Sequence, residues 1–352
     1  MGTRAPAASA LPPLAVSMGD PAGIGPDITL AAWQARREQG LSPFVVFGDR
    51  DALAARADAL GLDIEIGTLS DLGDAGAIFD ARLPVWPLPC AKPVIAGEPD
   101  PANGQAVIDA IETATRAVRR GEARALVTNP IAKAVLMAAG FPHPGHTEFL
   151  GALAEAHFGV QGARPVMLLA SSDLKVVPLT VHIPLARVPA ALSAEAIKAT
   201  ARILHRALIE DFAVPAPRIA VTGLNPHAGE DGKMGDEEAR IIAPALADLV
   251  REGLIVTGPH PADTLFHAAA RETYDAVLAM YHDQALIPIK TLAFDTGVNV
   301  TIGLPFVRTS PDHGTAFAIA GTGQARASSL IEALKVADAI ARCRAARHGE
   351  PA

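Results

Sequence analysis

The sequence predicts an α/β fold of two lobes with a mainly parallel sheet. At 352 residues the chain is longer than one hydrophobic core ordinarily accommodates, so two lobes are expected. Half of the residues are hydrophobic but only 4% are aromatic, so the core must consist mostly of Ala, Val, Leu and Ile. Short apolar runs alternate with segments of helical length, which is typical of βαβ units and parallel strands.

The individual elements follow from the apolar runs and the turns between them. Runs of four to six residues rich in Val, Ile and Leu predict strands over 14–18, 43–47, 125–128, 165–170, 176–181, 218–223, 275–280 and 298–302. Longer segments with helical periodicity predict helices over 27–39, 103–120, 131–139, 147–157, 193–211, 235–252 and 325–346.

Two Pro- and Gly-rich stretches, 140–146 and 303–314, are the expected crossings between the lobes. They predict a discontinuous first lobe made of 1–137 and 303–352. The second lobe is expected over 138–302.

Composition excludes several classes of protein. A net charge of −8 argues against a nucleic-acid-binding protein, which needs a basic surface. Cys90 and Cys343 lie far apart, so a disulfide framework or a cysteine zinc site is not expected. The N-terminal MGTRAPAASALPP has no apolar segment of signal-peptide length, and no apolar run is long enough to span a bilayer. We therefore expect a cytoplasmic protein.

Three histidines share one local context, because each follows an apolar run. The segments VVPLTVHIPL, RIAVTGLNPHAGE and DAVLAMYHDQ contain His182, His227 and His282. Residues just beyond the carboxyl ends of parallel strands face the crevice where α/β proteins bind ligands. A single histidine in such a place is more often a structural imidazole. Three at equivalent strand ends suit a divalent metal such as zinc, with one coordination position left open.

Two glycine-rich segments begin predicted helices. GLNPHAGEDGKMGDEE (223–238) predicts a loop that opens the helix over 235–252, with Asp236, Glu237 and Glu238 as acids favoured by the helix dipole. MGDPAGIGPDI (18–28) contains Gly23 and Gly25 but lacks the G-x-G-x-x-G pattern of the Rossmann fold. If the protein uses a nicotinamide cofactor, that cofactor must therefore bind by a different device.

Basic and polar residues gather late in the chain. The segment 283–316 places Lys290, Asn299 and Arg308 near expected strand ends and loops, where a lysine and an arginine suit a phosphate and a carboxylate. GHTEFL puts His146 and Thr147 at a helix start, with Thr147 as a candidate cap. A helix start also suits an anion.

Several long motifs together carry a family resemblance. They are MGDPAGIGPDI, VTNPIAK, GHTEFL, VHIPL, GLNPHAGEDGKMGDEE, GPHPADTLF, AMYHDQ and GVNVTIGLPFVRTSPDHGTAFAIAGTG. In this order and spacing, over about residues 14–340, the chain resembles the 4-hydroxythreonine-4-phosphate dehydrogenases of pyridoxal-phosphate biosynthesis. It is more distantly similar to isocitrate and isopropylmalate dehydrogenases, in which a loop like 312–323 cradles the adenosine of the cofactor.

The resemblance implies a three-layer, two-domain fold of the isocitrate and isopropylmalate dehydrogenase type. It implies a homodimer, with the active-site cleft between the two lobes at the dimer interface. It implies one divalent metal (zinc, magnesium or cobalt) per subunit, held by His182, His227 and His282 from both chains. It implies NAD or NADP as cofactor, near Gly23, Gly25, Asp312, His313 and Gly314. It implies substrate contacts from His146, Thr147, Lys290, Asn299 and Arg308.

The implied reaction oxidises 4-phosphooxy-L-threonine to 2-amino-3-oxo-4-phosphooxybutanoate. This product then loses carbon dioxide to give 3-amino-2-oxopropyl phosphate, on the route to pyridoxine 5'-phosphate. A metal cation favours loss of the alcohol proton. Either Lys290 or Asp283 can accept that proton, and the sequence does not choose between them.

Other functions fit part of the sequence. Asn129 and Ala285 stand where the family commonly has glycine, which bears on loop geometry and substrate choice. A sister dehydrogenase acting on D-threonate or D-erythronate 4-phosphate, or on a cyclic dihydrodiol, would need nearly the same contacts. A three-histidine metal hydrolase or aldolase leaves DHGTAFAIAGTG and GDPAGIGPD without a role. A protein that only binds a metabolite needs no metal with an open coordination position.

Overall fold

The computed structural model describes residues 11–143 and 145–349 and divides the chain into two compact units. Unit 1 is formed by the chain up to Ala163 and again from Leu304, and unit 2 spans Arg164–Gly303. The sequence placed the first crossing at 137/138, whereas the structure places it at 163/164. The reason is the helix α6 (His146–Phe158), whose Phe149, Leu150 and Leu153 are buried in the core of unit 1. Residues 1–10, where no targeting segment is expected, lie outside the described residues.

Unit 1 is built on six parallel strands. Their order is β3 (Ile66–Thr68), β4 (Leu83–Pro87), β2 (Phe44–Gly48), β1 (Leu14–Ser17), β5 (Ala125–Thr128) and β12 (Arg308–Pro311). The central strands are buried along their whole length, which explains their uninterrupted apolar sequences.

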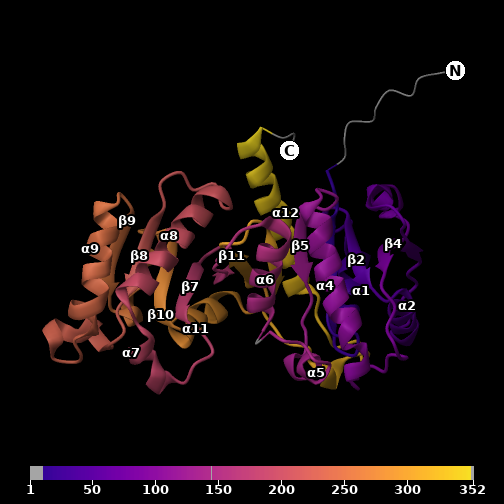
Figure 1. The fold of residues 1–352 in the computed structure, drawn as a ribbon, viewed down its shortest axis with the longest axis horizontal. Helices are drawn as coiled ribbons and strands as arrows, with labels where there is room; N and C mark the ends of the chain where they lie inside the picture. Colours follow the sequence, from indigo (N-terminus) through magenta and orange to yellow (C-terminus); the bar gives the residue numbers. More distant parts are fainter. Residues whose placement is uncertain (1–10, 144, 350–352) are drawn as a thin grey trace. The chain divides into compact units, whose positions relative to one another are not determined.

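Helices cover this sheet. They are α1 (Gly25–Gln34), α2 (Arg50–Ala59), α3 (Ala75–Ile78), α4 (Gly104–Arg119), α5 (Lys133–Ala138), α6 and α12 (Ser328–His348). α4 and α6 cover the same face of this sheet (Figure 1). Their buried side chains share one hydrophobic core with Ala15, Val45 and Leu126. α12 contacts β5 and β12 and also packs against α1. The two ends of the chain thus share one core.

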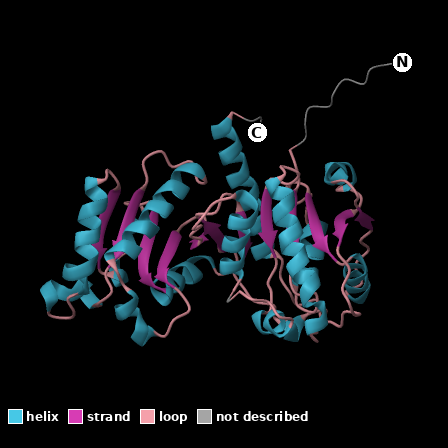
Figure 2. Cartoon of the chain, in the orientation of Figure 1, coloured by secondary structure: helices cyan, strands magenta, loops and turns pink. Residues whose placement is uncertain are grey.

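Unit 2 contains six strands of mixed direction. Their order is β11 (Val298–Ile302), β6 (Val166–Ala170), β7 (Lys175–Thr180), β10 (Ala276–Tyr281), β8 (Arg218–Thr222) and β9 (Ile255–His260). β6 runs antiparallel to both of its neighbours, and β7, β10, β8 and β9 are parallel. The flanking helices are α7 (Val188–Ala191), α8 (Ala194–Glu210), α9 (Ala243–Arg251), α10 (Ala268–Arg271) and α11 (His282–Ala293), visible in cyan in Figure 2.

The structure confirms an α/β fold with mainly parallel strands, and every strand expected from the sequence is present. The structure also contains four strands that the sequence did not predict, β3, β4, β9 and β12. Two unpredicted helices, α2 and α11, carry residues of the candidate sites. The expected helix over 235–252 begins only with a π-helical turn at Glu238, because Gly235 has a φ of +132° that no helix accommodates. No helix within residues 11–143 and 145–349 is long and apolar enough to cross a membrane.

Candidate active site

The three histidines follow three neighbouring parallel strands of unit 2. His182 comes just after β7, His282 directly after β10, and His227 in the loop after β8. β10 lies between β7 and β8 and pairs in parallel with both. All three histidines therefore lie beyond the same carboxyl edge, as the sequence predicts.

Two of these histidines lie close together. The ring centroids of His182 and His282 are 5.7 Å apart. The Nδ1 atom of His282 donates a hydrogen bond of 2.7 Å to Asp283, which directs its Nε2 atom away from that carboxylate. His227 is exposed. Within the described part of this single chain, no group of three or more His, Cys, Asp or Glu residues is arranged to hold a metal.

The loop that carries His227 has an unusual backbone. His227, Ala228, Glu230 and Asp231 have φ values between 42° and 55°, in the left-handed region, and Gly229 lies between them at 83°. Non-glycine residues rarely adopt this conformation, so the surroundings must impose it. Such a run of left-handed residues indicates a loop whose shape is fixed by specific contacts.

Glu238 supplies those contacts. Its side chain is 5% exposed, and its carboxylate accepts hydrogen bonds from the backbone N of Leu224 and of Asn225, both at 2.7 Å, and from Asn225 Nδ2 at 3.0 Å. Burial by itself would raise the pKa of Glu238, but the hydrogen bonds from Asn225 and Leu224 outweigh it and hold the pKa below its usual value. The sequence predicted Glu238 as an acid of the first helical turn, favoured by the helix dipole. Instead it is a buried anchor for the histidine loop.

A second set of contacts joins the end of β8 to the start of α11. The side chain of Gln284 accepts hydrogen bonds from Thr222 Oγ1 at 2.8 Å and from the backbone N of Met280 at 2.9 Å. Its amide nitrogen donates to the carbonyl of Gly223 at 2.7 Å. These bonds fix the point at which His282 begins the helix.

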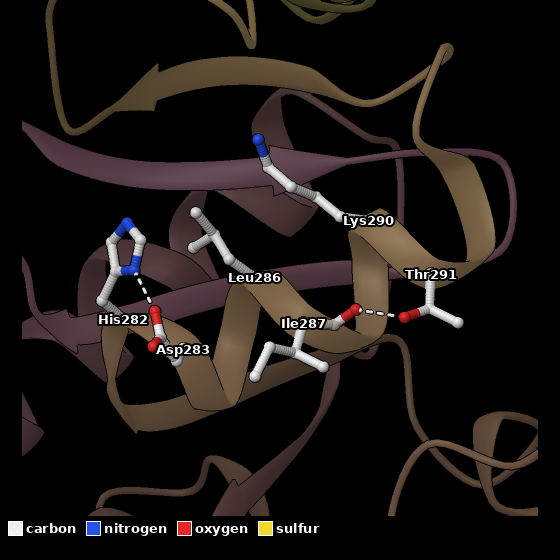
Figure 3. Close-up of a pocket in the computed structure, with 6 residues that line it drawn as sticks. All are labelled: His282, Asp283, Leu286, Ile287, Lys290 and Thr291. Carbon is white, nitrogen blue, oxygen red and sulfur yellow. Dashed lines mark hydrogen bonds and ion pairs between the residues drawn. The ribbon is translucent and has the colours of Figure 1, made fainter.

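A pocket of about 460 Å³ opens on α11 (Figure 3). The sequence placed Lys290 near a strand end or loop, but it lies on this helix. His282, Leu286 and Lys290 follow one another at intervals of four residues and extend to the same side of α11 (Figure 3). The pocket is lined by His282, Asp283, Leu286, Ile287, Lys290 and Thr291. It thus brings together one predicted metal ligand and both candidate proton acceptors.

Asn299 belongs to the other edge of unit 2. It lies on β11 opposite Leu169 of β6 and is half-buried. Among the described residues its Oδ1 atom is buried with no hydrogen-bond partner. A buried amide oxygen in this condition is an acceptor suited to a ligand.

Unit 1 carries a separate polar cluster around Arg308, the first residue of β12. Arg308 is 4% exposed, and its Nη2 atom donates to Thr128 Oγ1 at 2.6 Å and lies 3.4 Å from His146 Nδ1. Burial lowers the pKa of Arg308 to about 9. Burial, followed by the charge of Arg308, lowers the pKa of His146 well below its usual value. Thr147 was a candidate helix cap, but Gly145 occupies the N-cap position and Thr147 lies in the first turn.

The residues expected near a cofactor lie where the glycine turn meets the loop 312–323, also in unit 1. A Cβ atom at Gly23 would lie 2.9 Å from the carbonyl of Thr315, and one at Gly25 would lie 2.4 Å from the carbonyl of Met18. Close backbone packing therefore requires both glycines. Asp312 donates its backbone N–H to Ser329 Oγ at 3.2 Å, and His313 and Gly314 are exposed.

Sequence reasoning missed two residues at this junction. Arg56 and Asp27 form a buried ion pair that contacts both the glycine turn and the loop. Arg56 belongs to no recognisable local pattern. Only Asp27, within MGDPAGIGPDI, lay inside a motif that the sequence singled out.

The chain is similar in sequence to known proteins. The sequence model of the family described as "Pyridoxal phosphate biosynthetic protein PdxA" matches residues 40–337. A 4-hydroxythreonine-4-phosphate dehydrogenase of Methylorubrum populi is 55% identical over 332 residues, which cover 94% of this chain and 95% of that protein. One of Xanthobacter autotrophicus is 52% identical, with 97% of each chain covered.

The fold of the chain is also similar to those of solved structures. The crystal structure of 4-hydroxythreonine-4-phosphate dehydrogenase from Klebsiella pneumoniae is 39% identical with a TM-score of 0.84, covering 94% of this chain and 99% of that one. A terephthalate 1,2-cis-dihydrodiol dehydrogenase from Burkholderia xenovorans is 28% identical with a TM-score of 0.61, covering 92% and 97%. The chain belongs to the family of pyridoxal phosphate biosynthetic protein PdxA.

Proposed function

We propose that this protein oxidises 4-phosphooxy-L-threonine with NAD or NADP, and that the product loses carbon dioxide to give 3-amino-2-oxopropyl phosphate. Its family and its relatives at 50–55% identity, named 4-hydroxythreonine-4-phosphate dehydrogenases, support a dehydrogenase of this specificity. The observation that supports a phosphorylated substrate is the buried guanidinium of Arg308 beside Thr128 and His146.

This cluster has the chemistry of a phosphate site. A guanidinium donates charge-assisted hydrogen bonds to phosphate oxygens, and burial strengthens them. His146 and Thr147 occupy the first turn of the 13-residue helix α6, where backbone N–H groups have no partner within the helix. The Nε2 atom of His146 is buried without a hydrogen-bond partner among the described residues. A phosphate ester offers acceptor oxygens to these groups.

The donor set around His282 suits a divalent metal. Imidazole is a ligand for zinc and cobalt, and a carboxylate that accepts a hydrogen bond from the other ring nitrogen fixes the tautomer, as Asp283 does for His282. His182, His227 and His282 would hold the ion. When bound, the metal supplies positive charge that favours loss of the alcohol proton, and NAD or NADP supplies the hydride acceptor.

Three side chains of this protein have further roles in the proposed reaction. Asp283 orients His282, and this contact supports a positioning role. Lys290 extends from α11 to the same side as His282, within reach of the same pocket (Figure 3), and is the residue we assign to the hydroxyl proton. Asn299 offers its Oδ1 to the substrate.

Apolar side chains around the histidines support a homodimer with a shared site. Leu185 and Phe294 are 66% and 72% exposed, and Ile183 and Ile287 are also exposed. Ile183 and Leu185 follow His182, and Ile287 and Phe294 belong to α11 or its end. Large exposed apolar side chains grouped in this way are typical of protein interfaces. A second copy would cover them and supply the ligand that one chain does not bring to the pair His182 and His282.

A substrate panel tests the reaction. Purified enzyme with zinc, cobalt or magnesium should reduce NAD or NADP with 4-phosphooxy-L-threonine more efficiently than with D-threonate 4-phosphate, D-erythronate 4-phosphate or a cyclic dihydrodiol. Treatment with a chelator should abolish turnover, and metal should restore it. Preference for another substrate on the panel would replace the assignment, and hydrolase or aldolase activity without cofactor reduction would refute the dehydrogenase.

Mixed dimers test the shared site. Suppose that each site takes two ligands from one chain and the third from the other chain. If one subunit lacks the first of the two ligands that come from the same chain, and the other subunit lacks the second, both sites are broken. Mutations in any other pair leave one site intact. Co-refolding the pairwise combinations of His182→Ala, His227→Ala and His282→Ala should therefore restore activity in two pairs and fail in the third. Random pairing makes about half of the dimers mixed, so recovery should be about a quarter of wild type. No recovery in any pair, with subunit exchange verified, would place all ligands on one chain.

A further inference from the structure

We propose that Arg56 and Asp27 are positioning residues that hold the glycine turn 21–27 and the loop 312–323 in the one arrangement that binds the dinucleotide. The inference rests on the proposed function, because it assigns a mechanical origin to the cofactor site. Neither residue is assigned to contact the cofactor. Both act through the backbone of the two segments.

Arg56 reaches the glycine turn from helix α2. Its side chain is almost fully buried, and its Nη1 atom donates to the carbonyl of Gly23 at 2.9 Å and to the carboxylate of Asp27. Its Nη2 atom donates to the carbonyl of Pro21 at 3.1 Å. One guanidinium therefore fixes two carbonyls within residues 21–24, which precede α1 and have no regular secondary structure of their own.

Asp27 extends the same contact to the other end of the chain. One carboxylate oxygen pairs with Arg56, and the other accepts the backbone N–H of Gly321 at 2.7 Å. Gly321 has a φ of +73°, and a Cβ atom there would lie 2.9 Å from Cβ of Ala96. The loop is thus clamped to Asp27 at a position where only glycine fits.

Two backbone hydrogen bonds complete the junction. The N–H of Ile24 donates to the carbonyl of Thr315 at 2.9 Å, and the N–H of Gly97 donates to the carbonyl of Ala22 at 2.8 Å. The loop between 312 and 323 contains only the short 3-10 turn Phe317–Ile319. Its base is fixed while His313, Gly314, Ala316 and Ala318 are exposed. An exposed loop with a fixed base presents backbone groups to a ligand without first having to become ordered.

The choice of a buried ion pair supports a positioning role. Such a pair adds little stability compared with a well-packed apolar pair, because both charges must lose their hydration. Its specific effect is directional, since a guanidinium donates several hydrogen bonds in a fixed plane. Here these bonds reach Pro21, Gly23 and Asp27, which an apolar pair of the same volume would leave unbonded.

Arg56→Lys tests this inference, because lysine keeps the charge but lacks the planar fork. We expect the Kd for the reduced dinucleotide, measured by fluorescence with metal-loaded protein, to rise at least about tenfold through lost charge-assisted hydrogen bonds. The KM for the phosphorylated substrate should change less than about twofold, since Arg308 and its neighbours are untouched. Hydrogen exchange of the Gly321 amide should accelerate in cofactor-free protein. The matched control is Arg50→Lys, on the same helix, whose pair with Asp51 is solvent-exposed.

Asp27→Asn provides a second variant if Arg56→Lys folds poorly. Asparagine keeps the shape and an acceptor for Gly321 but removes the charge opposite Arg56, so the same rise in Kd and faster exchange are expected. An unchanged Kd and unchanged exchange in both variants would overturn the inference, as would equal losses for cofactor and substrate, which indicate a purely structural role. Wild-type protein that binds neither NAD nor NADP would overturn the proposed function itself, and the inference with it.

Discussion

Replacing Glu238 by glutamine should release the loop that carries His227. The wild-type carboxylate accepts two backbone N–H groups at one oxygen and Asn225 Nδ2 at the other. Glutamine keeps a carbonyl for the two backbone groups but places an amide NH₂ opposite Asn225 Nδ2, so two donors then face each other. The variant changes few atoms, which makes it a narrow test of the carboxylate.

The expected magnitude follows from the bonds lost. A hydrogen bond to a charged group contributes about 1.5–3 kcal/mol, so Glu238→Gln should destabilise the loop by about that amount. Glu238→Ala leaves two buried N–H groups without an acceptor, at about 1–3 kcal/mol each, and should cost more, about 2–6 kcal/mol. The left-handed residues 227–231 store backbone strain and should relax once the anchor is gone.

The effect should depend on pH in a defined direction. The hydrogen bonds from Asn225 and Leu224 outweigh burial and hold the folded-state pKa of Glu238 below the ordinary value of 4.5. A carboxyl whose pKa is depressed by folding stabilises the protein fully above its unfolded pKa, and this stabilisation disappears as the pH falls through the folded pKa. The difference between wild type and Glu238→Gln should therefore be constant near neutral pH and shrink below about pH 4.5.

Hydrogen exchange is the suitable assay, because it reports local opening at the amides of Leu224 and Asn225. Glu252→Gln is a matched control in the same unit. Glu252 pairs with Arg202 at 2.6 Å, but both side chains are substantially exposed, so its loss should have little effect on stability. Equal exchange rates at Leu224 and Asn225 in wild type and Glu238→Gln would refute the anchoring role. A second readout is zinc affinity, which should fall with the loosened His227 loop.

Three further outcomes are expected. Arg308→Lys should lower kcat/KM for the phosphorylated substrate by about tenfold to a hundredfold and spare its unphosphorylated analogue, and equal losses on both would remove the phosphate from this site. The depressed pKa of His146 should keep its ring neutral in an NMR titration below pH 6.5, and its contribution to stability should fall as the pH drops from 6.5 toward the folded pKa. Asp283→Asn should weaken zinc binding about tenfold to a hundredfold by calorimetry, while unchanged affinity would contradict its role beside His282.

Three central parallel strands could be predicted from the sequence because they are almost completely buried. β1, β5 and β10 lie between covered faces, so an uninterrupted apolar run marks each of them. Once the strands were known, the shared edge of His182, His227 and His282 followed from chain direction alone. Prediction was strongest where one physical requirement, the exclusion of water, determines a whole segment.

Elements whose sequence is not determined by burial alone were not predicted. β12 reads RTSP because it carries Arg308 into the core, so its sequence is polar although the strand is buried. α11 contains Pro288, which cannot donate a helical hydrogen bond and is typical of helix ends. The first turn of α11 is instead set by Gln284, whose side chain bonds to β8 and to the end of β10. Long-range bonds of this kind leave no periodic pattern in the sequence.

The same reason explains why the anchoring roles of Glu238 and of the Arg56–Asp27 pair were not predicted. The amide of Gly321 and the carboxylate of Asp27 are 294 positions apart in the chain, and no local signal pairs them. What the sequence did show were the glycines, which mark the places where another segment approaches closely. A Cβ atom at Gly235 would lie 2.2 Å from Asn225 Nδ2, next to the carboxylate of Glu238. In both units a buried charge thus meets a glycine-rich segment, and the charge supplies the directional bonds that make an irregular backbone rigid. A glycine-rich loop with such an anchor can present a ligand group as reproducibly as a helix or strand does, which is what the proposed metal and cofactor sites require.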